Sequence, residues 1–130
     1  MPAAVTLTVR YATDADIAAL MRLDERTRPA FDRNRVWDVL EWIEVLQDRK
    51  QCVVWVVEVP RGSELAAELL APRGMVGFCA CEWATTGAGL VLAVENMGYL
   101  TWAAGVRLQH QAQYHAGRFG RRVADDRIQG

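Results

Sequence analysis

The alternation of apolar and polar positions predicts a strand followed by a helix at the start of the chain. Val5, Leu7 and Val9 alternate with polar residues, which is the period of a strand with one buried face. A helix is predicted over residues 14–28, because Asp16 stands at its third position in an arrangement typical of a capping box. The first strand therefore leads almost directly into the first helix.

A second helix is predicted over residues 33–49, with Asp32 as a candidate for its N-cap. We expect one apolar stripe at helical spacing, made of Val36, Val39, Leu40, Ile43 and Leu46, to pack on a sheet. The acidic side chains on the opposite side of this helix are interpreted as a solvated surface rather than as a carboxylate site.

Three further strands are predicted after the second helix. Residues 52–59 are almost all β-branched or aromatic, which predicts a strand buried on both faces and therefore interior in its sheet. We expect residues 75–83 and the first strand to flank it. A short helix is predicted over residues 63–70, and residues 90–94 are expected to form another buried strand after a turn at 85–89.

The sequence signals weaken beyond Glu95. Residues 103–119 fit a helix whose inner side would carry Val106, His110, Gln113, Tyr114 and Gly117. Residues 120–130 are interpreted as a polar tail, so that residues 1–119 form a single domain. The expected fold class is α/β, with a mixed central sheet and helices on both of its faces.

Composition excludes several classes of partner. Apolar residues make up 52% and charged residues 24%, and the formal net charge is −1, which gives no general attraction to nucleic acid or an anionic membrane. No apolar run is long enough to span a membrane, and the N-terminus lacks the pattern of a signal peptide. The three cysteines, of which Cys79 and Cys81 share one face of a strand, are interpreted as reduced thiols. We therefore expect a cytoplasmic location.

Several reactive side chains have simpler interpretations than a catalytic role. His110 and His115 are not at the spacing that places two ligands on one helical face, so no metal is expected. Tyr99 and Tyr114 are interpreted as packing residues rather than proton donors. An arginine cluster near the C-terminus could meet a phosphate or nucleic acid, but is interpreted as solvated surface: Arg118, Arg121 and Arg122, beside Phe119.

Two segments carry motifs of a known type. The first runs from a short strand into a helix and contains Val9, Arg10, Ala12, Thr13, Asp16 and Ile17; the second contains Val76, Gly77 and Phe78. In this order they resemble the GCN5-related N-acetyltransferases. Residues 31–59 look like the second helix and second strand of the branch of ribosomal-protein-alanine N-acetyltransferases. The resemblance covers residues 5–95.

The resemblance implies an acyl-CoA N-acyltransferase-like fold, acetyl-CoA as donor, and a protein N-terminus or a small amine as acceptor. Backbone groups of four residues would hold the pantetheine arm: Val91, Leu92, Ala93 and Val94. Gly105 and neighbouring N–H groups would meet the pyrophosphate, with Arg107 adding positive charge. This loop departs from the family's pattern, because Trp102 stands where Arg or Gln is usual and Arg107 where a small residue is usual.

Glu95 matches the position at which some members of the family place the carboxylate that removes the proton of the amine. The alternative interpretation is a solvated carboxylate at a strand end. A helix that ends near Phe119 leaves too few residues for the family's last strands and for the tyrosine that protonates the leaving thiolate in many members. The chain is therefore interpreted either as an acetyltransferase or as a degenerate or truncated member that serves as a binding module. We expect a second copy or a partner protein to cover an exposed edge beside residues 90–94.

Overall fold

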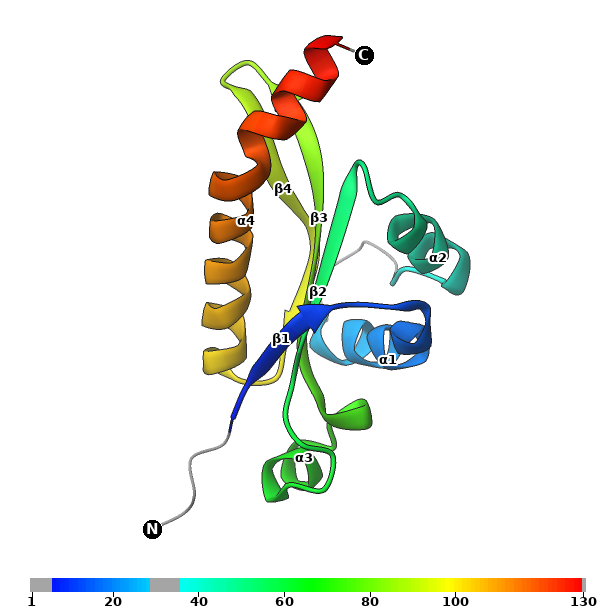
Figure 1. The fold of residues 1–130 in the computed structure, drawn as a ribbon. Coiled ribbons are helices and arrows are strands. Elements are labelled where there is room, and N and C mark those ends of the chain that lie inside the picture. The colour runs from blue at the N-terminus through cyan, green and yellow to red at the C-terminus, as the bar shows by residue number, and fades with distance from the viewer. Residues whose placement is uncertain (1–5, 29–35, 130) are drawn as a thin grey trace.

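The computed structural model describes residues 6–28 and 36–129, in which four strands form one sheet in the order β1-β2-β3-β4 (Figure 1). The strands are β1 (Thr8–Tyr11), β2 (Cys52–Glu58), β3 (Met75–Thr86) and β4 (Gly89–Tyr99). The helices are α1 (Ile17–Thr27), α2 (Val39–Gln47), α3 (Glu64–Leu69) and α4 (Trp102–Gln129), with 3-10 turns at Asp14–Asp16 and Pro72–Gly74. The expected α/β class is confirmed, and the described strands pair antiparallel throughout.

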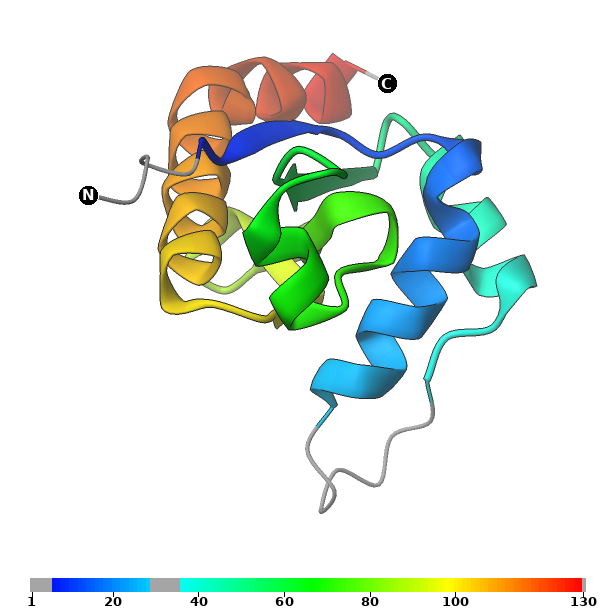
Figure 2. The same cartoon turned by 90° about the horizontal axis from the view of Figure 1, so that it is seen from below.

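β2 is the interior strand that its unbroken apolar run predicts. It pairs with β1 on one side and with β3 on the other. Val54 and Val56 belong to the core under α1 and α2, while Trp55 and Val57 belong to the core under α4. The views in Figures 1 and 2 show these helices on opposite faces of the sheet. A strand with two buried faces has to be apolar at every position, which is why the sequence predicts it so directly.

A charged cluster joins β1 to the turn that precedes α1. The guanidinium of Arg10 donates to both carboxylate oxygens of Asp16 at 2.8 Å and to those of Glu58 at 3.0 and 3.2 Å. Burial by itself raises the pKa of Asp16, but the hydrogen bonds from Arg10 and Thr13 outweigh it and hold this pKa below its ordinary value. The expected capping box is present at this turn. The cluster therefore ties strand, turn and helix together.

α2 differs from the prediction at its start and in its buried face. Its N-cap is Asp38, whose side chain accepts from the N–H of Glu41. The candidate cap Asp32 lies outside the described residues. The predicted stripe is wrong at Val39 and Leu40, which are 46% and 64% exposed, whereas Leu46 packs against the core as predicted.

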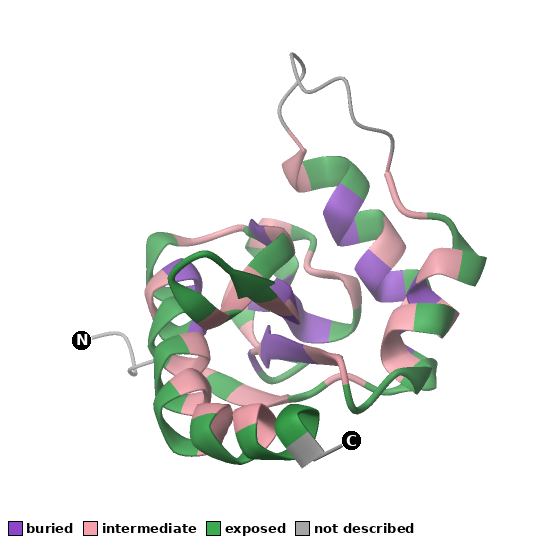
Figure 3. Ribbon diagram, turned by 90° about the horizontal axis from the view of Figure 1, so that it is seen from above, coloured by how far each residue is buried: buried purple, intermediate pink, exposed green. Residues whose placement is uncertain are grey.

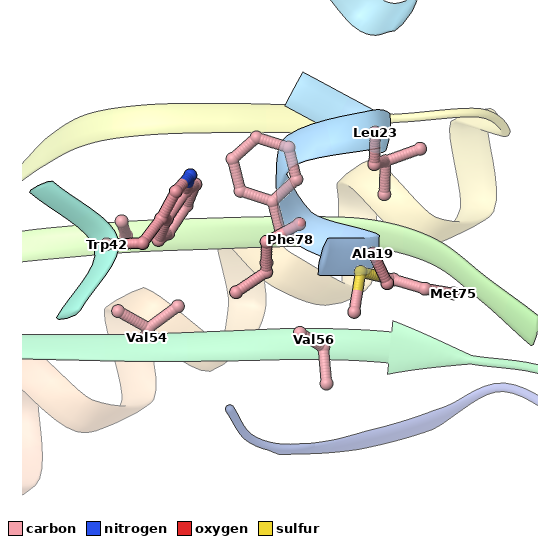
Figure 4. Close-up of a cluster of buried hydrophobic side chains, with 9 residues drawn as sticks. Ala19, Leu23, Trp42, Val54, Val56, Met75 and Phe78 are labelled. Carbon is pink, nitrogen blue, oxygen red and sulfur yellow. The ribbon is translucent and has the colours of Figure 1, made fainter. Parts of the chain in front are cut away.

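The core residue of α2 is Trp42, which the predicted stripe leaves out. It is fully buried, and its ring packs edge to face on Phe78, with 5.6 Å between ring centroids (Figure 4). It packs edge to face on Trp37 as well, at 4.8 Å. The indole ring buries far more apolar area than a Val or Leu side chain, so it sets the rotation of the helix. A pattern based only on the spacing of apolar residues does not take this difference in side-chain size into account.

β4 is longer and more exposed than predicted. The expected strand over 90–94 runs from Gly89 to Tyr99, and Val91 and Val94 are 38% and 53% exposed rather than buried. Among the described strands β4 lies at one edge of the sheet and β1 at the other, so the expected edge beside residues 90–94 is present. The expected burial of these residues is wrong, because the side chains of an edge strand are covered by fewer neighbours.

α4 packs on the sheet through a different face from the one predicted. The side chains that contribute to the core on this side include Ala104, Leu108 and Ala112. The predicted inner residues are exposed or only half-buried: Val106, His110, Gln113, Tyr114 and Gly117. A Cβ at Gly77 of β3 would lie 3.1 Å from the Leu108 side chain, so this glycine allows the helix to approach the sheet.

The helix does not end near Phe119, since residues 120–129 continue α4. The side chain of Arg127 ties its last turns to β3, donating to the hydroxyl of Thr85 at 3.0 Å and to the carbonyl of Trp83 at 3.0 Å. Buried residues gather on the sheet and on the sheet-facing sides of the helices (Figure 3). Among the described residues, no helix is long and apolar enough to cross a membrane.

Candidate functional site

The free edge of β4 carries a β-bulge at Glu95. Residues 77–80 of β3 pair with 96–99 of β4, and residues 81–86 pair with 89–94, so Glu95 is the extra residue between two registers. A bulge bends its strand and leaves the extra residue unpaired. Glu95 is exposed at this point. The candidate base thus lies at an irregularity within a long strand and not at a strand end.

Glu95 shares its surroundings with two other carboxylates. Burial raises the pKa of the Cys52 thiol to about 11, and the negative charges of Asp48, Glu82 and Glu95 contribute to this rise. The thiol therefore stays protonated at neutral pH. The same negative charges favour a cationic ligand, such as an ammonium group, near Cys52.

A buried ion pair in α1 anchors β4 just beyond the bulge. Asp24 is 2% exposed and accepts from the Arg28 guanidinium at 2.8 Å. It also accepts from the side-chain amide of Asn96 at 2.9 Å. Two residues further along, a Cβ at Gly98 would collide with Thr27 of α1, so strand and helix are in close contact. The position of Glu95 therefore depends on a polar contact between sheet and helix.

The first turn of α4 lies at the far end of β4. The N–H of Ala104 donates to the Thr101 hydroxyl and that of Gly105 to the Thr101 carbonyl, both at 3.2 Å. Within the described residues, the N–H groups of Trp102 and Ala103 are the donors of this helix end that have no intrahelical partner. Gly105 itself is buried inside the turn, and its N–H is already used.

Gly105 allows the helix to pack closely on Tyr99, because a Cβ at this position would lie 3.0 Å from the Tyr99 ring. Trp102 at the first helical position is 80% exposed, and Arg107 is exposed one turn later. In the described residues no ion pair joins Arg107 to an acid. Four strand residues, or about 13 Å, separate Glu95 from Tyr99. A carboxylate within β4 and a cationic helix terminus beyond the end of β4 thus lie along one exposed strand edge.

The other side chains considered from the sequence lie away from this edge or are engaged. The hydroxyl of Tyr114 accepts from Arg118 at 2.6 Å on the exposed side of α4. His115 is half-buried among aromatic rings, whereas His110 is exposed. Among the residues described, no group of three or more His, Cys, Asp or Glu side chains could hold a metal ion.

Sequence reasoning missed the contact between Asp24 and Asn96. One signal was present, because Asp24 falls where the apolar stripe of α1 should continue toward the core. A carboxylate at a core position requires a partner. The partner is 72 residues away in the chain, and no local pattern identifies it.

Comparison with known proteins supports the fold. The structure is similar to the crystal structure of an acetyltransferase from Trypanosoma brucei, with a TM-score of 0.53 and 16% sequence identity. The match covers 92% of this chain and 78% of the other. No protein-family model matches the sequence, and no curated protein does. The expected acetyltransferase-like fold is confirmed, and at this identity the likeness concerns the fold alone.

Proposed function

We propose that the chain binds acetyl-CoA along the free edge of β4 and transfers the acetyl group to an amine, of a protein N-terminus or a small molecule. The observation that carries the proposal is one continuous edge with a carboxylate at a bulge and unpaired helix N–H groups at its end. The acetyltransferase-like fold supports the same assignment.

The donor is bound mainly by the backbone. Amide groups of the pantetheine arm pair with the outward N–H and C=O groups of β4 over Val91, Leu92, Ala93 and Val94, as an added strand would. The exposed Val91 and Val94 side chains give the arm apolar contact. The pyrophosphate meets the N–H groups at the start of α4, next to Gly105, and the guanidinium of Arg107.

The reaction is a direct acyl transfer. The neutral amine attacks the thioester carbonyl, the new C–N bond forms, and the C–S bond breaks to release coenzyme A. The ammonium form loses one proton to water to give this neutral amine. During the attack Glu95 accepts a second proton from the nitrogen and passes it to the thiolate sulfur of the departing coenzyme A, which leaves as the thiol.

The affinity for acetyl-CoA is expected to be weak. Of the first-turn donors of α4, those of Ala104 and Gly105 already bond to Thr101, so few N–H groups converge on a phosphate. We expect a dissociation constant in the high micromolar range, or a binding free energy of about −5 kcal/mol.

Replacing Glu95 by glutamine is expected to lower acetyl transfer to a model amine about 100-fold, because the nucleophile loses its base. Steady-state kinetics with the model amine, measured at one fixed pH, checks this. Glu25→Gln, an exposed change on α1, serves as the matched control and should leave the rate unchanged. Equal rates in both variants would remove Glu95 from the mechanism.

A second candidate function is a binding module without catalysis. The engaged N–H of Gly105 and the bulky Trp102 at the phosphate end favour it. In this case the apolar edge of β4 pairs with a second copy of the chain. Light scattering and calorimetry with acetyl-CoA together separate the two functions. A dimer that persists in the presence of acetyl-CoA, together with no measurable heat of binding, would support only the binding module.

A further inference from the structure

A groove lies at the opposite end of the sheet from the start of α4. It runs from the end of β1 and the C-terminal end of α2 to the last turns of α4. Its two parts have volumes of about 480 and 810 Å³ and share the side chains of Arg49, Trp83 and His115. These volumes are typical of small-molecule sites, at about 300–1,000 Å³. The groove plays no part in the function proposed above.

One side of the groove is an aromatic wall, formed by Trp83, His115 and Phe119. The His115 ring lies 4.7 Å from that of Phe119 and 6.0 Å from that of Trp83, measured between centroids. Burial lowers the pKa of His115, so its imidazole is neutral at physiological pH and behaves as one more flat ring. A planar ligand can stack or pack edge to face on such a wall.

The groove also has a cationic rim, formed by Arg49 and Lys50 just before β2 and by Arg122 on α4, all exposed. Two acids, Asp14 and Asp126, also line the groove. In the described part of the chain no ion pair joins the rim to either acid. The negative charges of Asp48, Glu82 and Glu95 act on Cys52, which lines only the part of the groove near α2. In the part lined by Lys50 and Arg122 the rim therefore retains its charge for an anion.

A polar frame holds the end of the groove in place. Arg127 donates to the side-chain oxygen of Gln51 at 2.8 Å, and Gln51 donates to the carbonyl of Trp83 at 2.6 Å. These contacts connect α4 with β3 and with the residue that precedes β2. The aromatic wall and the cationic rim are thus positioned before any ligand arrives, which lowers the entropy cost of binding.

We propose that this groove is a binding site for a nucleoside phosphate, with the base on the aromatic wall and the phosphate at the cationic rim. Flat apolar rings combined with unpaired cations suit this chemistry, because every base offers a π face and every phosphate an anion. An apolar protein partner would instead leave the rim cations buried and unpaired. The ligand is either a free nucleotide, which leaves the donor site proposed above unchanged, or the nucleotide portion of coenzyme A, which would then bind here and not at the start of α4.

Amide and indole signals of the full chain, followed by nuclear magnetic resonance during titration with AMP, test the proposal. The Trp83 indole and the amides of residues 49–51 and 115–122 should shift together. The double variant Arg49→Gln/Lys50→Gln should weaken AMP binding about tenfold, as expected for two partly exposed charge contacts. Arg22→Gln, an exposed arginine on α1, is the matched control and should bind AMP as the wild type does.

Adenosine and inorganic phosphate, each tested alone, should bind more weakly than AMP. Equal affinities for AMP and phosphate would show that the aromatic wall does not bind the base, which would contradict the proposal. No shift at millimolar AMP, or equal losses in the double variant and the control, would overturn the proposal. Titration with adenosine 3′,5′-bisphosphate and with acetyl-CoA distinguishes a free nucleotide from the nucleotide portion of coenzyme A as the ligand. If acetyl-CoA shifts the groove and not β4, the nucleotide site stands and the β4 proposal fails.

Discussion

Replacing Trp42 by alanine is expected to destabilise the fold by about 3–5 kcal/mol. The side chain is fully buried between α2 and the sheet, against Phe78 and Trp37. Its removal loses apolar burial and leaves a cavity that the surrounding rings cannot fill. Urea denaturation followed by circular dichroism measures the change, with the midpoint shifting at constant slope if unfolding remains two-state.

Leu40→Ala, on the same helix, is the matched control. Leu40 is 64% exposed, so its loss should change the free energy of unfolding by no more than about 0.5 kcal/mol. The apolar stripe predicted from the sequence gives the opposite order, with Leu40 in the core. A larger loss at Leu40 than at Trp42 would show that the stripe, and not the indole, faces the sheet.

Asp24→Ala is expected to cost about 3 kcal/mol, because it leaves buried partners without their acceptor. The carboxylate accepts from Arg28 and Asn96, so its loss affects both α1 and the strand that carries the bulge. Thermal and urea unfolding measure the effect. Glu25→Ala, exposed at the next position, should stay within about 0.5 kcal/mol of the wild type.

A double-mutant cycle with Asn96→Ala isolates the contact between helix and strand. If Asn96 acts through Asp24, the two changes together should cost less than the sum of the single changes. Additive losses would mean that the two side chains stabilise the protein separately. In that case α1 would not hold the bulge in position.

The sequence predicts best the elements whose residues are uniform. β2 is apolar at every position from Cys52 to Val57, so its identity and its interior place in the sheet can be predicted from local sequence. α3 is also predictable, because Ser63 caps it and its side chain accepts from Ala66. These features depend only on neighbours in the chain.

The sequence predicts least where long-range contacts decide the structure. The exposure of β4 depends on its position at an edge of the sheet. The buried face of α4 depends on Gly77 of β3, where the absence of a side chain allows the helix to approach. The end of α4 depends on Arg127, whose partners precede it by more than 40 residues. Glu95 could be named from the sequence, whereas the bulge that exposes it follows only from the register of β3.

The proposed binding of acetyl-CoA along the edge of β4 can be tested by titrating the full chain with acetyl-CoA and following its amide signals. We expect shifts that begin at Val91–Val94, include the bulge at Glu95 and end at Trp102 and Ala103. Saturation is expected in the high micromolar range. No shift at these amides with millimolar acetyl-CoA, or shifts confined to other parts of the protein, would contradict the claim.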